Sequence, residues 1–146
     1  MKIYIASSWK NSDSVRNMAV RLRKEGHKVF DFTDPECCKT EKFPHGKRPE
    51  PYDPAKHKSY AALLRNGAMY ASVMNNQEAI RWCDLVIMLQ PCGLDAHCDW
   101  AYGLGLGKAT VICGQPRAGD TVYTHSWADK VLDNPEDVYE FIKKNY

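Results

Sequence analysis

The 146-residue sequence predicts a single α/β domain built on a doubly wound, mostly parallel open sheet, with about five strands and helices on both faces. Three observations predict it. Short apolar segments alternate with longer ones whose apolar residues recur at helical spacing. Asp84–Gln90 is a nearly continuous apolar run, typical of a central parallel strand buried on both faces. The first segments read strand, helix, strand, a unit that forms parallel sheets with right-handed crossovers.

The expected elements follow in order along the chain. Strands are predicted at Lys2–Ala6, His27–Phe32, Asp84–Gln90 and Ala109–Cys113, with a short one at Asp129–Leu132. Helices are predicted at Asp13–Glu25, at Lys58–Cys83 with a division at Gly67, at Asp95–Gly107, and after Asn134. Ser12 is the expected N-cap of the first helix, Gly26 its C-terminal stop, and Asn134 the N-cap of the last helix, with Pro135 at its first position. This order is Rossmann-like or flavodoxin-like.

The segment Thr33–His57 breaks the pattern. It contains Pro35, Pro44, Pro49, Pro51 and Pro54, together with charges of both signs. A connection of this length in a compact domain is typical of a lid or of a disordered segment. We therefore expect one domain over residues 1–146, with a lid or insert at about 33–57; a solvated insert without a role is the alternative.

Composition excludes several classes of protein. The formal net charge of +2 is too small to indicate binding to a nucleic-acid polymer. No apolar run approaches the roughly 20 residues that span a bilayer, so no membrane partner is expected. The start of the sequence passes directly into a strand pattern without the features of a signal peptide, and a cytoplasmic location is expected. The six cysteines are then reduced thiols, and neither a metal site nor a cofactor is predicted.

Chemistry-bearing residues gather where ligands bind in doubly wound folds, at the carboxyl ends of the strands. Three loops meet there: Ser7–Ser12, Pro91–His97 and Gly114–His125. Asp95 and Asp99 are four residues apart and share one helix face, with His97 in the same turn. Such crowding favours acid–base roles. The alternative is structural, with Asp95 as an N-cap, Asp99 as a solvated acid and His97 on the surface.

Polar and aromatic residues of the first loop suggest a ligand site. Ser7, Ser8, Asn11 and Ser12 precede a helix N-terminus, which is a ready anion site. Trp9 offers a ring on which a base can stack. Ordinary helix capping by the polar residues, and coverage of the sheet edge by Trp9, are the alternatives. Gly103, Gly105 and Gly107 end a helix instead of opening one after a strand, so they indicate close packing with a stop at Gly107, not a dinucleotide fingerprint.

Four features together resemble the nucleoside 2-deoxyribosyltransferase family, which includes nucleoside 5′-monophosphate N-glycosidases. They are Ile3-Tyr4-Ile5-Ala6 before a polar loop, the stretch from Asn76-Gln77-Glu78 to Asp84-Leu85-Val86, the loop Pro91-Cys92-Gly93-x-x-Ala96-His97, and Asp99-x-Ala101-x-Gly103-x-Gly105-x-Gly107-Lys108. The resemblance covers most of the chain except the insert and Gly114–His125.

The resemblance implies an enzyme that cleaves the N-glycosidic bond of a nucleoside or nucleotide and passes the sugar to another base or to water. The family's glutamate nucleophile falls on Asp99, which is one methylene shorter but still a carboxylate able to form a glycosyl ester. A family aspartate falls near Asn76, which is neutral. Asp95 is the candidate for a missing acid. Tyr4 corresponds to an aromatic residue that positions the nucleophile or the sugar, although a core tyrosine is equally compatible with the pattern.

The implied substrate-binding residues are Ser7, Ser8, Trp9, Asn11, Asn76, Gly93 and His97. The polar first loop favours a hydrolase of 5′-monophosphates over a transferase. The family also implies a homo-oligomer, with the Lys58–Cys83 segment and Trp100 as candidate contacts. Two other functions stay open: a non-catalytic nucleotide-binding module, favoured by Asp99 and Asn76 in place of the family's residues, and a TIR-like NAD glycohydrolase, which shares the sheet and a helix carboxylate.

Overall fold

The computed structural model describes residues 1–34, 52–65, 67–119 and 123–146. It contains a parallel five-stranded sheet in the order β2-β1-β3-β4-β5, formed by β1 (Lys2–Ala6), β2 (Lys28–Phe30), β3 (Leu85–Leu89), β4 (Ala109–Cys113) and β5 (Lys130–Leu132). The predicted doubly wound α/β fold is therefore confirmed. The central strand β3 is buried along its whole length, as its continuous apolar run predicts.

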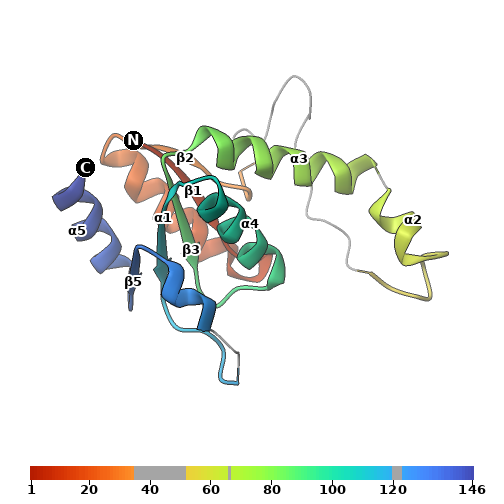
Figure 1. The fold of residues 1–146 in the computed structure, drawn as a ribbon. Coiled ribbons are helices and arrows are strands. Elements are labelled where there is room, and N and C mark those ends of the chain that lie inside the picture. The colour runs from red at the N-terminus through yellow and green to blue at the C-terminus, as the bar shows by residue number, and fades with distance from the viewer. Residues whose placement is uncertain (35–51, 66, 120–122) are drawn as a thin grey trace.

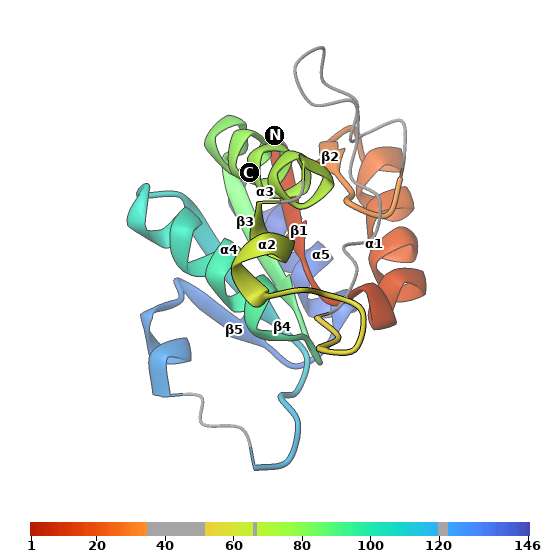
Figure 2. The same cartoon turned by 90° about the vertical axis from the view of Figure 1, so that its right-hand side faces the viewer.

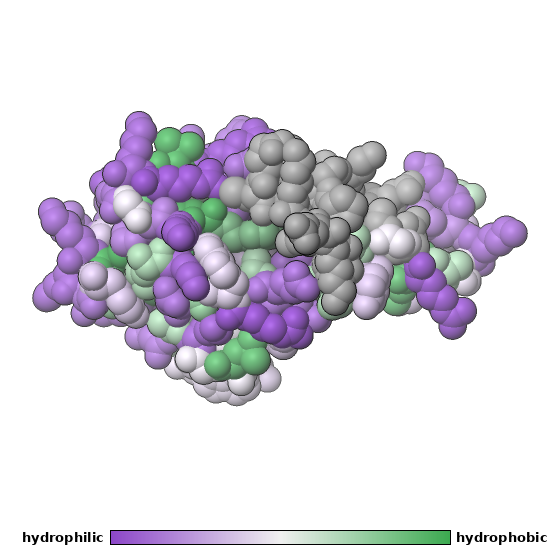
Figure 3. Space-filling view, turned by 90° about the horizontal axis from the view of Figure 1, so that it is seen from above, coloured by the Kyte–Doolittle hydropathy of each residue, from purple (hydrophilic) through white to green (hydrophobic). Residues whose placement is uncertain are grey.

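Helices cover both faces of the sheet (Figure 1). On one face lie α1 (Ser12–Lys24) and α5 (Pro135–Asn145), and on the other α3 (Gly67–Trp82) and α4 (Leu94–Gly105). Helix α2 (Tyr60–Leu64) and the start of α3 extend beyond the sheet (Figure 1), and in the turned view α2 lies in front of the strands (Figure 2). Seen from above, the molecule is elongated, and hydrophilic side chains cover much of that face (Figure 3). No helix in the described ranges is long and apolar enough to cross a membrane.

Amphipathic spacing explains how the helices pack. The buried residues of α1 are Val15, Met18, Ala19 and Leu22, the i, i+3, i+4, i+7 stripe that faces a core. In α4 the closest approach is at Gly103, where an added Cβ would lie 2.6 Å from Cγ2 of Val86 on β3. The expected close packing of helix against sheet is thus confirmed at Gly103, whereas Gly105 has open space around it.

Most helix ends match the sequence prediction. Gly26 and Gly107 adopt φ of +88° and +70°, the left-handed conformation that favours glycine after a helix. The Asn134 side chain accepts a hydrogen bond from the backbone N–H of Asp137, as expected for an N-cap. Ser12 was wrongly predicted as the N-cap of α1: it is the first helical residue, because Ser8 and the 3₁₀-helix η1 (Trp9–Asn11) already turn the chain.

The long segment divides as expected near Gly67, with α2 before it and α3 from it onward. The predicted loop Gly114–His125 contains the start of a second 3₁₀-helix, η2 (Tyr123–Trp127). Of the expected lid, residues 35–51 lie outside the described part of the chain. The division into one domain with a lid stays a prediction.

Candidate functional site

The expected meeting of loops at the carboxyl edge of the sheet is observed. Ser7, directly after β1, donates a hydrogen bond from Oγ to the backbone oxygen of Leu89 at the end of β3, at 2.7 Å. Asn11 donates from Nδ2 to Ser7 Oγ at 3.2 Å. Neighbouring parallel strands end at the same edge, so the residues that follow them are brought together. In this structure Ser7 and Asn11 tie the first loop to β3.

A cavity of about 660 Å³ opens at this edge. Its described lining comes from the loop after β1, from the residue two positions after β2, from α2 and α3, and from the N-cap and first turns of α4: Ser7, Ser8, Trp9, Lys10, Phe32, Leu64, Met69, Ser72, Val73, Asn75, Asn76, Gln77, Gly93, Asp95, Ala96, Cys98, Asp99 and Tyr102. Sites for small organic ligands commonly enclose roughly 300–1,000 Å³. The cavity therefore has room for a nucleoside-sized molecule.

Asp99 is the most chemically distinctive residue of the cavity. Its Oδ2 accepts two hydrogen bonds, one from the hydroxyl of Tyr4 at 2.7 Å and one from Nδ2 of Asn76 at 3.1 Å. Burial raises the pKa of Asp99 from 3.8 to about 6, and the negative charge of Asp95 also raises it, against the two hydrogen bonds, which lower it. A carboxyl group with a strongly shifted pKa in a cavity is typical of functional sites.

Tyr4 reaches Asp99 from inside the core. It belongs to the middle of β1 and is fully buried. Its ring stacks on Phe30 of β2, with centroids 5.3 Å apart. The ring does not line the cavity, but the hydroxyl donates to the carboxylate that does. Tyr4 is thus both a core residue and a polar support of Asp99, so the two interpretations of the sequence hold together.

The remaining predicted residues divide into two groups. Ser7, Ser8, Trp9, Asn76, Gly93 and Asp95 line the cavity together with Asp99. Asp95 is exposed in the first turn of α4, whose N-cap is Gly93 instead. Trp9 is partly buried, edge-on against Phe32 with ring centroids 5.1 Å apart. Asn11 and His97 are not among the lining residues.

His97 lies in the first turns of α4 but belongs to a separate cluster with His125 and Trp100. Its Nδ1 lies 2.9 Å from the carbonyl oxygen of Gly93, to which it donates because a carbonyl only accepts. Its Nε2 lies 3.1 Å from Nε2 of His125, and the two rings stack with centroids 5.2 Å apart. The nearly buried His125 also packs edge-on against Trp100. In this structure His97 of α4 contacts η2 through His125.

Sequence reasoning missed the contribution of α3 to the cavity. Met69, Ser72, Val73 and Asn76 follow the spacing i, i+3, i+4, i+7, so they form one face of the helix. Tyr102, three residues after Asp99, extends the same face of α4. Both patterns are visible in the sequence. Neither pattern predicts the cavity, because a mixed polar and apolar stripe does not by itself distinguish a cavity wall from a packed face.

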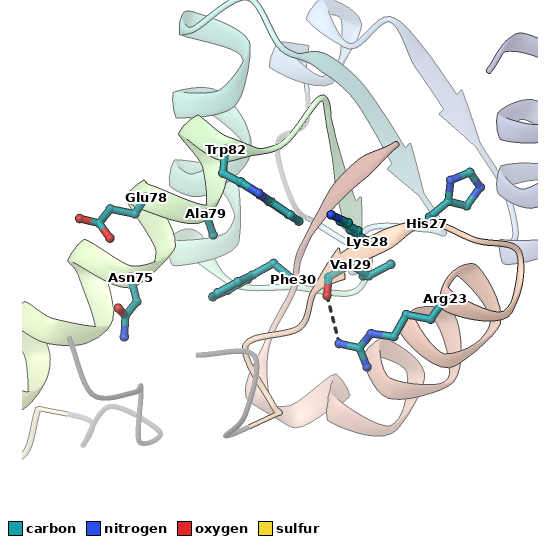
Figure 4. A pocket seen from close by; sticks show the side chains of 9 residues that line it. All are labelled: Arg23, His27, Lys28, Val29, Phe30, Asn75, Glu78, Ala79 and Trp82. Atoms are coloured by element: carbon teal, nitrogen blue, oxygen red, sulfur yellow. Dashed lines mark hydrogen bonds between the residues drawn. The ribbon is translucent and has the colours of Figure 1, made fainter. Parts of the chain in front are cut away.

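A second cavity of about 600 Å³ lies at the β2 edge of the sheet (Figure 4). Phe30 and Trp82 project into it from β2 and α3, and Arg23 crosses its wall to donate to the backbone oxygen of Val29 at 3.0 Å. Among the described residues that line this cavity, no carboxyl group is held by two donors. The two cavities are neighbours, because Asn75 lines both of them. Phe30 of the second cavity also stacks on the ring of Tyr4, whose hydroxyl binds Asp99.

Side chains that could ligate a metal ion do not cluster in the described part of the chain. Within the described ranges, no group of three or more His, Cys, Asp or Glu side chains is placed to hold a metal ion. Within the described residues, no disulfide is formed by Cys83, Cys92, Cys98 or Cys113, and burial raises the pKa of Cys83 and of Cys113 to about 11.

The fold and the site define a class of protein: a doubly wound parallel α/β domain with a hydrogen-bonded carboxylate at the carboxyl edge of its sheet. Solved structures of two enzymes share this fold. One is a 2-deoxyribosyltransferase from Bacillus psychrosaccharolyticus, with a TM-score of 0.61 and 19% identity over 100% of this chain and 92% of that chain. The other is a CMP N-glycosidase from Clostridium botulinum, with a TM-score of 0.54 and 12% identity over 98% and 99%. No family model and no curated protein matches the sequence. The fold implied by the sequence resemblance is confirmed.

Proposed function

We propose that this protein cleaves the N-glycosidic bond of a nucleoside or nucleoside 5′-monophosphate, with Asp99 as the nucleophile. The observation that carries the proposal is the carboxylate of Asp99, held by Tyr4 and Asn76 on the wall of a nucleoside-sized cavity. The fold shared with a deoxyribosyltransferase and a CMP N-glycosidase supports it. Both of those proteins act on a bond between a sugar and a base.

The reaction takes place in two steps. A carboxylate oxygen of Asp99 attacks the anomeric carbon, the carbon–nitrogen bond breaks, and its electron pair leaves with the base nitrogen. A glycosyl ester of Asp99 remains. Water then attacks the anomeric carbon, the ester bond breaks, and the carboxylate is regenerated with release of the free sugar and one proton. Attack by the nitrogen of a second base in place of water gives transfer.

The departing base requires a proton, and Asp95 is our candidate donor. It lies on the same wall of the cavity, one helical turn before Asp99, and its charge already influences that group. A protonated Asp95 would give its proton to the base nitrogen and recover it from the attacking water, which is the usual exchange of acid and base roles.

The first loop is our candidate for recognising the rest of the substrate. Trp9 presents a ring to the cavity on which a base can stack. Ser8 and Lys10 line the same wall, and a hydroxyl and an ammonium are suitable partners for a 5′-phosphate. Ser8 already accepts a hydrogen bond from the backbone N–H of Lys10, so its hydroxyl proton remains available to donate.

The deciding experiment is incubation of the protein with ribo- and deoxyribonucleosides, their 5′-monophosphates and NAD, followed by chromatography of free bases. Base released from nucleosides or monophosphates supports the proposal. Nicotinamide released from NAD instead supports a TIR-like glycohydrolase. Tight binding by calorimetry with no base released from any compound would overturn the enzymatic proposal in favour of a nucleotide-binding module.

Assembly is a further part of the proposal. Tyr60, Leu64, Tyr70 and Val73 of α2 and α3 are exposed by about half of their surface, and Leu64 and Val73 also line the cavity. A second copy of the chain resting on this face would complete the wall. Trp100, expected as a contact, cannot take part because it is buried in the core. Multi-angle light scattering tests this, and a monomer at working concentration would contradict it.

The segment at about 33–57 is proposed as a lid over the cavity. Phe32, which directly precedes it, lines the cavity wall. Lids order when a ligand binds and exclude water from the reaction. Limited proteolysis within the segment should therefore slow when substrate or product is added, and unchanged cleavage would contradict a lid.

A further inference from the structure

The two hydrogen bonds to Asp99 fall on the same oxygen. Tyr4 on β1 and Asn76 on α3 both donate to Oδ2, from two elements that do not belong to the helix of Asp99. Oδ1 accepts no hydrogen bond from any residue in the described ranges. The two oxygens of one carboxylate are therefore in different environments: one held by two donors, the other left for the cavity.

The amide of Asn76 has one sensible orientation. An ionised carboxylate only accepts hydrogen bonds, so the amide nitrogen, and not its oxygen, must face Asp99. The side chain is partly buried on the cavity wall, and the helix α3 that carries it packs against α4. Two packed helices thus fix the distance between the amide and the carboxylate.

We propose that Asn76 is a positioning residue: with Tyr4 it fixes Oδ2 of Asp99, so that Oδ1 is the oxygen that attacks the anomeric carbon. The inference rests on the proposed function. It differs from the substrate-binding role expected for Asn76 from the sequence. A near-attack geometry requires the reacting atoms to be held within narrow limits, and a carboxylate free to rotate would present either oxygen.

An amide at this position also keeps Asp99 able to ionise. A carboxylate in its place would put two like charges about 3 Å apart, and such a pair retains one proton to higher pH. Asn76 is neutral at every pH and donates to the charged form of Asp99, which favours ionisation. The other titratable groups that face this region are Tyr4 from β1, Asp95, Cys98 and Tyr102 from α4, and Lys10 from the first loop.

The test compares two isosteric changes that add the same charge. Asn76→Asp places a carboxyl next to Asp99. Gln77→Glu adds a carboxyl to the same cavity wall, at a residue that makes no hydrogen bond to Asp99. Asn76→Ala removes the donor without adding charge. The pKa of Asp99 is followed by ¹³C NMR of the aspartate carboxyls, with the signal assigned by its loss in Asp99→Asn, and kcat and KM are measured against pH.

We expect Asn76→Asp to raise the apparent pKa of Asp99 by about one unit or more, and to lower kcat at neutral pH roughly tenfold with its rising limb moved to higher pH. Asn76→Ala should lower kcat much more than KM and raise the pKa less. Gln77→Glu should change the pKa of Asp99 little, because Gln77 makes no hydrogen bond to Asp99. Equal behaviour of Asn76→Asp and Gln77→Glu in the NMR titration would overturn the inference. Because that titration needs no turnover, a wild-type protein without glycosidase activity would refute the proposed function, while the titration would still show whether Asn76 holds the carboxylate of Asp99.

Discussion

Replacing Asp99 by asparagine separates the chemistry of the carboxylate from its contribution to the fold. The change is nearly isosteric, and the amide oxygen of asparagine can still accept from Tyr4 and Asn76 where Oδ2 does now. The amide can neither form a glycosyl ester nor stabilise positive charge on the sugar. Removal of one member of a catalytic unit typically lowers the rate by several powers of ten. We expect base release to fall to that extent.

The same change should make the protein more stable. In the folded protein the pKa of Asp99 is raised from 3.8 to about 6, so the folded state binds the proton more tightly than the unfolded state does. One pKa unit corresponds to about 1.4 kcal/mol, so the charged carboxylate lowers the free energy of unfolding by roughly 2–3 kcal/mol at pH 7. A neutral asparagine removes this cost.

The stability gained by Asp99→Asn should depend on pH. Between pH 3.8 and about 6 the unfolded chain has lost the proton that Asp99 keeps in the folded protein, so the contribution of Asp99 to stability falls as pH rises through this window. The stabilisation by Asp99→Asn should therefore be small below pH 4 and complete above about pH 6. At pH 7 it corresponds to a rise in Tm of roughly 5–10 °C for a domain of this size.

Differential scanning calorimetry at pH 4 and pH 7, together with a base-release assay, measures both effects. Asp95→Asn is the matched control, because Asp95 is exposed and its replacement should leave Tm nearly unchanged. Wild-type turnover in Asp99→Asn would refute the nucleophile. If Asp99→Asn were less stable than the wild type at pH 7, this would refute the argument that the buried charge of Asp99 lowers stability and is retained for function.

Three further predictions concern other parts of the molecule. Asp95→Asn removes a negative charge that raises the pKa of Asp99, so the rising limb of the kcat profile should move to lower pH; a profile that stays in place or moves to higher pH would contradict the coupling. Ser8→Ala should raise KM for 5′-monophosphates several-fold and for nucleosides much less, and equal effects in steady-state kinetics would rule out a phosphate contact. Gly103→Ala puts a methyl group 2.6 Å from Val86 and should lower the free energy of unfolding by about 1–3 kcal/mol in urea denaturation, whereas Gly105→Ala, in open space, should not lower it.

Much of the fold follows from local patterns in the sequence. The continuous apolar run of β3, the i, i+3, i+4 stripe of α1 and the glycine stops after α1 and α4 each depend on a few neighbouring residues. For that reason the five strands, the principal helices and the parallel class of the sheet could be predicted. The edge at which the loops gather followed in turn, because all strands of a parallel sheet end on the same side.

The composition of the site was only partly predictable. The helical spacing of Asp95 and Asp99 is local, and both line the cavity. The wall contributed by α3 and the hydroxyl of a core tyrosine on β1 depend on how elements far apart in the chain pack together. The same holds for His97, which the sequence grouped with the site and the structure places against His125.

The sequence by itself thus determined the class of fold, the carboxylate on α4 and the edge of the sheet where it lies. Only the tertiary structure decided which groups touch that carboxylate. Tyr4 and Asn76 are separated from Asp99 by 95 and 23 residues, and they meet it because β1 runs beside β3 beneath α4 while α3 packs along α4. Two donors on one oxygen, and the burial that raises the pKa of Asp99 to about 6, arise from that packing, because hydrogen bonds and desolvation depend on distances in space and not on spacing along the chain.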